Sequence, residues 1–357
     1  MLSHVVEYLK RTDAGNRTTA AFGKRWVKNF LKNLENINKT LLYKQTEIPV
    51  IITGSGPNLE KAIPVIQKAR ENCLIIASSS SVMALSHNGI KADLVISTDG
   101  GNWALRHIYA AYRNKQTDIL AVNLNAALPS QLNNTRFLII NDGSIWQNII
   151  LHELSLPSVI IPQRGTVTAT AVDLAMILSS GNIYLAGMDL SVNDIRTHVK
   201  PYGFDSLFFS RANRFSPVYS QLFTRSGLLQ RGKSLDIYAA WFKDQIKSWQ
   251  KRIYSIEPDN KKQNIFKQGN PLEQSNLKIK KDYNIFKTSD TTINSSFSSQ
   301  RGAGILIKAL KENKYSEDIK KELSAFFFPG EKEVSKEILE TALMKIAAKS
   351  RTKALNE

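Results

Sequence analysis

The stretch PVIITGSGPNLEKAIPVIQKARENCLIIASSSS, residues 49–81, contains the pattern that decides the fold. It begins with a short apolar run, Pro49–Thr53, and reaches a second one, Cys73–Ala77, after a helix-length segment from Leu59 to Arg70. Strands that are buried on both faces of a parallel sheet have this uninterrupted apolar character. The stretch therefore predicts a strand, a helix and a second strand parallel to the first.

The same alternation continues along the chain to about residue 190. A short helix is expected over Val82–His87, and further apolar runs are Leu94–Ser97, Ile119–Val122, Phe137–Ile140, Ser158–Ile161 and Ile183–Ala186. Alternating strands and helices are typical of a doubly wound parallel sheet. We therefore predict an α/β fold with a Rossmann-like, mostly parallel sheet, helices on both of its faces, and helical extensions at both ends of the chain.

Periodicity and composition divide the chain into segments. The expected segments are an N-terminal helical segment (1–46), the Rossmann-like core (47–255, with a lid at about 191–240), an irregular linker (256–303) and a C-terminal helical extension (304–357). In the first segment, Phe22, Trp26, Phe30 and Leu34 recur every four residues, which predicts a helix docked on the core by one face. The C-terminal charges are intermixed, as in a solvated helical hairpin.

Composition excludes several classes of protein. The 357 residues are 42% hydrophobic, which indicates a globular chain, and neither a membrane span nor a Sec signal is recognisable. The single cysteine, Cys73, rules out an internal disulfide framework and fits a reducing cytoplasm. The net charge of +17 lies outside a neutral middle, residues 51–190, and no nucleic-acid-binding motif is present. A nucleic-acid partner is therefore not expected.

Small and polar residues follow every apolar run. The segments are Thr53–Leu59, Ser78–Ser81, Ser97–Gly101, Asn123 with Asn125, Asn141–Gly143, Gln163–Thr166 and Gly187–Asp189. In an open parallel sheet, ligands bind outside the carboxyl ends of the strands. We therefore expect segments 54–57, 97–100, 165–167 and 187–189 to converge on one edge of the sheet and to form a site.

Two of these segments suit an anion. A dinucleotide fingerprint is absent because Leu59 stands where its third glycine would be, and Walker A is absent as well. Gly54 and Gly56 would still let a phosphate approach the backbone at a helix N-terminus. Thr166 is a predicted N-cap of a mostly apolar helix, whose free amides would point into the same site.

One histidine stands apart from the other four. His4 and His87 are expected at the surface, and His107 and His152 within helices. His198 follows the Gly187–Asp189 segment in a polar loop, where an imidazole could reach a ligand and titrate near neutral pH. A solvated loop histidine with no function is the competing interpretation.

Several of these motifs together resemble a known family. Gly54–Leu59, Gly89–Asp99, Ala186–Leu190 and Arg196–His198 resemble, in this order, the Maf (motility-associated factor) flagellin glycosyltransferases, whose core is the 6-hydroxymethylpterin pyrophosphokinase MptE-like domain. The resemblance covers residues 20–250, approximately. Gly165–Asp189 is also similar to bacterial sialyltransferases that use CMP-activated sugars.

The resemblance implies transfer of a sialic-acid-like nonulosonic acid, of the pseudaminic or legionaminic type, from its CMP nucleotide-sugar donor to Ser/Thr of flagellin in the cytoplasm, without a metal cofactor. It implies His198 as the base, with Asp189 and Asp99 as residues that hold ribose or loop groups. Basic residues such as Arg196 or Lys200 could neutralise the departing CMP. The expected catalytic residues are His198, Asp189 and Arg196. The expected donor-binding residues are Gly54, Ser55, Gly56, Pro57, Ser78, Asp99, Asn123, Gly165, Thr166 and Gly187.

Two alternatives remain open at this point. A pterin-type pyrophosphokinase would bind ATP at the same edge and hold magnesium on Asp99 and Asp189. A non-catalytic accessory protein would keep the sheet and bind flagellin through its basic flanks. A requirement for magnesium separates the two enzymes, and binding of flagellin without any nucleotide identifies the accessory protein.

Overall fold

The core of the described part of the chain is one sheet of nine parallel strands, which differ in length. The computed structural model describes residues 2–113, 118–130, 132, 134–231, 234–246, 248–249, 252–256, 265–273, 285–289, 297–312 and 314–354. The strand order is β10-β9-β8-β2-β3-β4-β5-β6-β7, and each neighbouring pair is parallel. The strands are β2 (Val50–Thr53), β3 (Leu74–Ser78), β4 (Leu94–Ser97), β5 (Ile119–Asn123), β6 (Arg136–Asn141), β7 (Ser158–Ile160), β8 (Ile183–Ala186), β9 (Ile253–Ser255) and β10 (Lys267–Gln268). The predicted fold class and the seven predicted strands are confirmed.

The two faces of the sheet have separate cores. On β2, Ile51 belongs to one core, whereas Val50 and Ile52 belong to the other, because successive side chains of a strand point to opposite faces. The first core includes residues of α2 (Leu59–Ala69), α3 (Val82–His87), α4 (Leu105–Arg113) and α5 (Ile145–Glu153). The second includes residues of α6 (Val167–Leu178) and α9 (Ser234–Gln245). The sheet is therefore covered by helices on both faces, as the sequence predicted.

The crossover through α6 determines where the chain reverses its direction across the sheet. Strands β2 to β7 follow one another in chain order, and α6 then returns the chain to place β8 beside β2. β2 and β8 therefore meet at the switch point of the sheet, where ligands of open α/β folds commonly bind.

The N-terminal helix, α1 (Leu2–Asn33), docks on the first core as predicted. Phe30 and Leu34 are fully buried, and the ring of Phe30 lies 4.8 Å from that of Trp146 on α5. The helix ends at Asn33, about a dozen residues before the expected boundary. The side-chain nitrogen of Asn33 donates 2.8 Å hydrogen bonds to the carbonyls of Leu124 and Ala126, which tie this end of the helix to the core.

The chain between α1 and residue 46 contains no further α-helix. A 3-10 turn, η1 (Leu34–Asn36), precedes strand β1 (Leu41–Tyr43), which pairs antiparallel with β11 (Phe286–Thr288). The expected irregular linker, 256–303, thus contains β10, β11 and the start of α10, and its other residues lie largely outside the described ranges.

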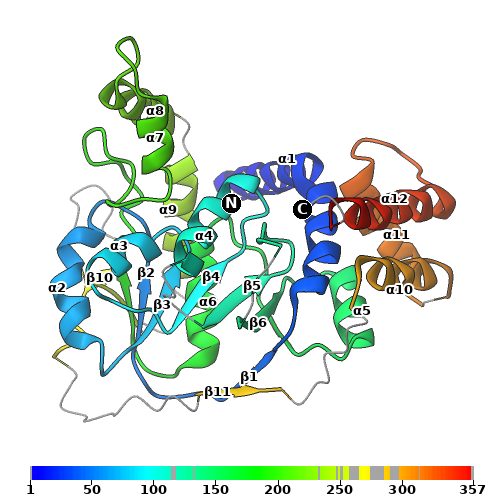
Figure 1. Ribbon diagram of the computed structural model, residues 1–357, viewed down its shortest axis with the longest axis horizontal. Helices are drawn as coiled ribbons and strands as arrows, with labels where there is room; N and C mark the ends of the chain where they lie inside the picture. Colours follow the sequence, from blue (N-terminus) through cyan, green and yellow to red (C-terminus); the bar gives the residue numbers. More distant parts are fainter. Residues whose placement is uncertain are drawn as a thin grey trace.

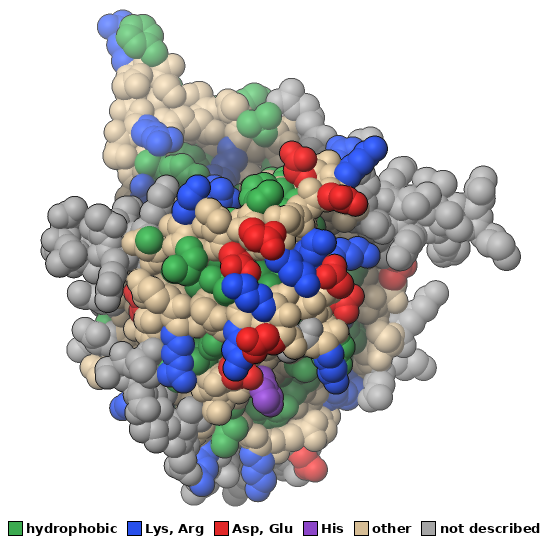
Figure 2. Space-filling model, turned by 90° about the vertical axis from the view of Figure 1, so that its right-hand side faces the viewer, with side chains coloured by type: hydrophobic (Ala, Val, Ile, Leu, Met, Phe, Trp, Pro, Cys, Tyr) green, Lys and Arg blue, Asp and Glu red, His purple; other side chains and the backbone are tan. Residues whose placement is uncertain are grey.

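The C-terminal region is a three-helix layer and not the solvated hairpin that the sequence suggested. It consists of α10 (Ser299–Glu312), α11 (Ser316–Phe327) and α12 (Lys336–Ala354), which lie beside α1 (Figure 1). Leu306, Leu323 and Leu339 are fully buried in the first core, one from each helix. Basic and acidic side chains alternate over the outer face (Figure 2), and this mixed exterior concealed the apolar stripes in the sequence.

The segment expected to form a lid contains helices of two kinds. α7 (Asp205–Arg211) and α8 (Val218–Arg231) project from the body of the protein (Figure 1), whereas α9 packs on the second core through the fully buried Phe242. Among the described residues, no helix combines the length and the apolar character needed to cross a bilayer.

Candidate functional site

A cavity of about 590 Å³ opens at the carboxyl ends of β4, β5 and β6. We call it the site cavity. Its wall is formed by residues that follow these strands, by the start of α6, by α1 and by single residues of the lid segment and α9. The polar residues among them are Thr18, Thr98, Asp99, Asn123, Asn125, Asp142, Gln163, Arg164, Thr166, Thr170, His198 and Tyr238. Of the four segments expected to converge, 97–100 and 165–167 contribute to the lining of this cavity, whereas 54–57 and 187–189 are absent from its described lining.

The N-terminus of α6 forms one wall of the site cavity. Thr166 caps the helix, because its hydroxyl oxygen accepts a 3.0 Å hydrogen bond from the Ala169 amide. Gly165 is needed here for a different reason, since a Cβ would approach the ring of Tyr238 to 3.0 Å. Thr166 and Val167 both line the cavity, so the positive end of the helix dipole lies at its wall. The N-cap predicted at Thr166 is confirmed, and the binding of an anion at this helix N-terminus stays a prediction.

A network of carboxylate and amide groups holds the opposite strand ends. The Asp99 carboxylate accepts a 2.7 Å hydrogen bond from the Gly101 amide, and the Asn123 side-chain oxygen accepts a 2.9 Å bond from the Asn125 amide. The Asn125 side-chain nitrogen donates to Asp142 at 3.3 Å, while its side-chain oxygen is buried without a partner among the described residues. A buried orphan acceptor at a cavity wall is suited to a ligand hydroxyl or amino group.

His198 lies in the wall of the site cavity, as the sequence predicted, but it does not titrate near neutral pH. Its ring stacks on Tyr202 with centroids 4.1 Å apart, and its Nδ1 lies 2.8 Å from the Thr197 hydroxyl. Burial, and after it the positive charge of Arg225, lowers the pKa of His198 to about 3. The imidazole is therefore neutral at pH 7 because it lies in a packed aromatic and cationic cluster and not in a solvated loop.

The cluster around His198 brings together elements that are distant in the sequence. His107 of α4 is buried, lies 4.9 Å from the Tyr202 ring, and has its pKa lowered to about 4, chiefly by burial. Arg225 of α8 stacks over Phe204 at 5.5 Å. Burial raises the pKa of Tyr202 to about 12, so Tyr202 remains protonated at neutral pH. The cluster thus joins the projecting helix α8 to the wall of the site cavity.

The Gly54–Pro57 loop meets the Gly187–Asp189 loop at the switch point and leaves no room for a phosphate at Gly56. A Cβ on Gly56 would lie 2.7 Å from the Asp189 carboxyl carbon and from the Gly187 carbonyl oxygen, and a Cβ on Gly54 would lie 2.5 Å from that same oxygen. The amides of Gly54 and Gly56 donate to carbonyls of the β8 end, at 2.7 and 2.8 Å. The glycines therefore permit contact between two loops, and the expected phosphate space is occupied by protein.

Asp189 binds the backbone at the start of α2. Its Oδ2 accepts a 2.8 Å hydrogen bond from the Asn58 amide, whereas its Oδ1 is buried without a partner in the described part of the chain. Burial is the main cause that raises the pKa of Asp189 to about 6. The loop-holding role expected for Asp189 is thus observed, and its carboxyl does not belong to the described lining of the site cavity.

Other expected site residues also lie outside the described lining of the site cavity. Arg196 forms an ion pair with Glu60 of α2, with Nη1–O distances of 3.0 and 3.2 Å. Ser78 is buried, and its hydroxyl lies 3.2 Å from that of Ser80. Ser55 offers its carbonyl to the Val199 amide at 2.9 Å. Roles of these residues in donor binding or catalysis stay predictions.

The structure thus brings together five of the expected site residues and adds others. Asp99, Asn123, Gly165, Thr166 and His198 line the same cavity. From the sequence, Trp26 of α1 was expected on a docking face, and neither Tyr238 of α9 nor Arg225 was singled out. Aromatic residues at helical spacing give the same signal in a core and in a cavity wall, so only the packing of the helices could assign them.

Comparison with known proteins shows a similarity that covers most residues of the site cavity lining. Residues 24–194, which include most of its lining, match the family model described as 6-hydroxymethylpterin diphosphokinase MptE-like. Two uncharacterized proteins of Treponema pallidum (strain Nichols) are each 30% identical to the chain. One aligns over 227 residues (63% of this chain, 48% of the relative) and the other over 113 residues (27% and 54%).

A solved structure has a similar arrangement at low sequence identity. The Maf glycosyltransferase from Magnetospirillum magneticum AMB-1 aligns with a TM-score of 0.49 and 13% identity, over 92% of this chain and 54% of that one. The chain therefore spans about half the length of the relatives and of the solved structure that it matches. The MptE-like similarity expected from the sequence motifs is confirmed by the match of the family model to residues 24–194.

Proposed function

We propose that this chain is a glycosyltransferase that moves a nonulosonic acid from a CMP donor to a hydroxyl group of a protein acceptor, flagellin. The observation that carries the proposal is that one cavity contains both the N-terminus of α6 and a neutral imidazole, His198. The helix N-terminus would bind an anionic donor, and the neutral imidazole would take the proton from the hydroxyl group of the acceptor. The resemblance of the sequence to Maf proteins supports the same reaction.

The donor has two anionic groups, the phosphate of CMP and the carboxylate of the sugar. Backbone amides at the start of α6, next to Gly165 and Thr166, would bind one of them. Asp99 and Asn123, which line the same cavity, would accept hydrogen bonds from hydroxyl and amino groups of the nucleoside. Arg196 would have to leave Glu60 before it could neutralise the donor.

The acceptor oxygen would attack the anomeric carbon of the sugar while the bond to the phosphate oxygen breaks, and CMP would leave with the bonding electrons. The acceptor proton would pass to Nε2 of His198, because Nδ1 is engaged by the Thr197 hydroxyl. An imidazole with a pKa of about 3 is a weak base, and burial and Arg225 are what weaken it. An anionic donor bound beside His198 in the site cavity would raise that pKa, so the base would become stronger when the donor is bound.

Replacing His198 with alanine tests the proposal. We expect turnover of CMP-activated sugar onto flagellin to fall about a hundredfold to ten-thousandfold, because a general base contributes about this much. The affinity for CMP, measured by calorimetry, should change little. His152→Ala on the exposed surface of α5 is the matched control. Turnover within a few fold of the unaltered protein would remove His198 from the mechanism.

A diphosphokinase is the second candidate, favoured by the description of the family model. Asp99 and Asp142 both line the site cavity, and their carboxylates are suitable magnesium ligands. Asp189, which the sequence suggested as the second ligand, instead binds the Asn58 amide. Calorimetry with CMP, ATP and NAD, each with and without magnesium, separates the candidates. ATP binding that requires magnesium supports the kinase, and binding of flagellin but of no nucleotide supports an accessory protein.

A further inference from the structure

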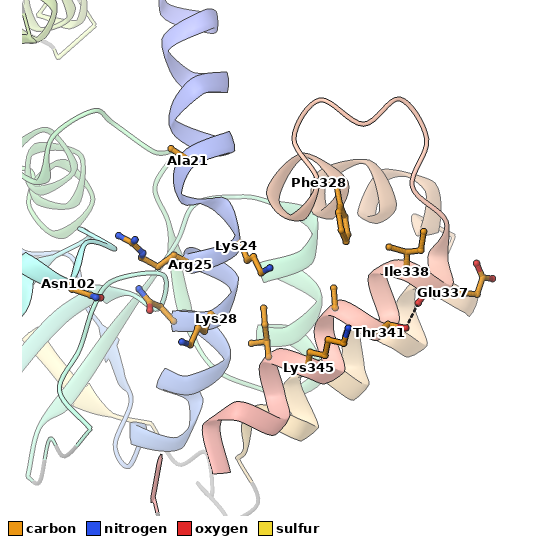
Figure 3. Close-up of a pocket in the computed structure, with 13 residues that line it drawn as sticks. Ala21, Lys24, Arg25, Lys28, Asn102, Phe328, Glu337, Ile338, Thr341 and Lys345 are labelled. Carbon is orange, nitrogen blue, oxygen red and sulfur yellow. Dashed lines mark hydrogen bonds between the residues drawn. The ribbon is translucent and has the colours of Figure 1, made fainter. Parts of the chain in front are cut away.

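A second and larger cavity, of about 950 Å³, lies between α1 and α12 (Figure 3). We call it the basic cleft. α1 contributes to the walls of both cavities through adjacent stripes of its surface. Phe22 and Trp26 line the site cavity, whereas Ala21, Lys24 and Lys28 line the basic cleft. A molecule bound in the cleft would therefore lie directly beside the proposed site.

The cleft is strongly cationic. Lys24, Arg25 and Lys28 enter its lining from α1, and Lys345 enters it from α12. All four are exposed, and none has an ion pair with a residue in the described ranges. Glu337 is the acidic residue of the described lining, and Figure 3 shows its side chain directed away from the gap between the helices. The fold thus leaves several positive charges around one opening without a matching negative charge.

Apolar side chains lie among the basic ones. Phe328, Ile338, Ala342 and Ile346 line the same cleft, and Ile346 is buried. Arg25 points away from the gap between the helices (Figure 3) and lies over the ring of Phe22, 5.4 Å from its centroid, so the positive charge facing the gap comes from the lysines. Lys24, Lys28 and Lys345 around an apolar floor match an occupant that has both carboxylates and apolar side chains. A small inorganic anion would leave the apolar floor in contact with water, and it would not need a cavity of this size.

The walls of the basic cleft and of the site cavity are linked by one side chain. Asn29 lines the cleft, and its side-chain nitrogen donates to the carbonyls of Gly100 and Asn125, at 3.2 and 2.9 Å. Both of these residues line the site cavity. Asn102 of the cleft directly follows Gly101 of the site cavity. A polypeptide that leaves the cleft would therefore cross α1 beside Asn29 to reach the wall of the site cavity.

We propose that the basic cleft binds an acidic, partly apolar segment of the acceptor polypeptide and delivers a neighbouring hydroxyl to the site cavity. This inference rests on the proposed glycosyl transfer to a protein. The arrangement favours a polypeptide over a nucleic acid because the floor is mainly aliphatic, with Phe328 as the aromatic residue of the described lining, whereas single strands bind by stacking on aromatic platforms.

The test uses the full chain and a defined probe, so that it does not depend on turnover. The probe is a fluorescein-labelled synthetic peptide that repeats Glu-Leu-Ser, compared with one that repeats Lys-Leu-Ser. The cleft variant is Lys24→Glu with Lys28→Glu. The matched control is Lys68→Glu with Lys91→Glu, two exposed lysines outside the cleft lining. Fluorescence anisotropy gives the affinity at low and at physiological ionic strength.

We expect the acidic peptide to bind and the basic peptide not to bind. The cleft variant should lose about tenfold in affinity, because two attractions between exposed charges become two repulsions. The control should bind as the unaltered protein does, and added salt should weaken binding. Equal affinity of the cleft variant and the control would overturn the proposal. Tighter binding of a single-stranded oligonucleotide, lost in the cleft variant, would overturn the choice of a polypeptide.

Calorimetry with CMP on the same samples keeps this inference distinct from the proposed function. If the unaltered protein binds CMP but not the acidic peptide, the cleft assignment fails and the proposed transferase remains. If it binds the peptide at the cleft but does not bind CMP, the proposed donor is wrong and the cleft remains a site for acidic polypeptide.

Discussion

Replacing Asp189 with asparagine tests whether the negative charge of this buried carboxyl lowers the free energy of unfolding. Its Oδ2 accepts the Asn58 amide at 2.8 Å, and its Oδ1 is buried without a partner among the described residues. Burial raises its pKa from an ordinary value of 3.8 to about 6. The protonated carboxyl is therefore favoured in the folded protein relative to the unfolded chain.

The sign of the pH dependence follows from proton binding. Between pH 3.8 and about pH 6 the folded protein holds this proton while the unfolded chain releases it, so the free energy of unfolding falls as the pH rises through this window. The full shift corresponds to about 3 kcal/mol. Asp189→Asn keeps an oxygen that accepts the Asn58 amide and removes the charge. The variant should thus be more stable than the unaltered protein above pH 6, by up to about 3 kcal/mol, and about equally stable at low pH.

Urea unfolding followed by far-ultraviolet circular dichroism, across a series of pH values, measures this difference. Asp93 adds a similar slope, because burial also raises its pKa to about 6, and this part should persist in the variant. Asp118→Asn, at an exposed carboxyl, is the control and should leave the slope unchanged. If Asp189→Asn were less stable than the unaltered protein at pH 8 and kept the full slope, a favourable partner of the charged form would be required and the reasoning would fail.

Two further substitutions test the packing. Phe30→Ala should lower the free energy of unfolding by about 3–5 kcal/mol, because a fully buried ring in contact with Trp146 is lost; a urea midpoint close to that of the unaltered protein would contradict the docking of α1. Gly56→Val should destabilise the protein, because its side chain would overlap the Asp189 carboxyl and the Gly187 carbonyl. A Gly56→Val variant with unchanged circular dichroism and weakened CMP binding would instead restore a phosphate site at this loop.

The sheet could be predicted because each of its long strands is buried on both faces. Such strands need uninterrupted apolar residues, as in Val50–Thr53 and Leu74–Ser78, and polar residues mark where they end. The edge that carries the site followed from the parallel direction alone. Strands β9 and β10 were missed because they have only three and two residues and little apolar content.

The sequence could not predict which strand ends line the site cavity and which pack against each other at the switch point, because this depends on the strand order. Asp99 and Asp189 both follow apolar runs, and nothing local distinguishes them. Because α6 returns β8 to the side of β2, the loop of Asp189 packs on that of Gly56, whereas Asp99 faces a cavity. Likewise, the low pKa of His198 arises from burial and from the charge of Arg225. Arg225 reaches His198 only through the tertiary position of α8, which the sequence does not reveal.

The contact between α1 and the C-terminal helices has a consequence for synthesis on the ribosome. Trp26 of α1 packs against Phe326 of α11, with ring centroids 6.1 Å apart, although some 300 residues separate them in the sequence. At about 5–20 residues per second, α1 emerges roughly 15–60 s before its last partners. During that interval the nascent chain presents the apolar stripe of α1 without its C-terminal cover, as a target for chaperones. Because α1 also lines the site cavity, the site reaches its final form only after translation has passed α11 and α12.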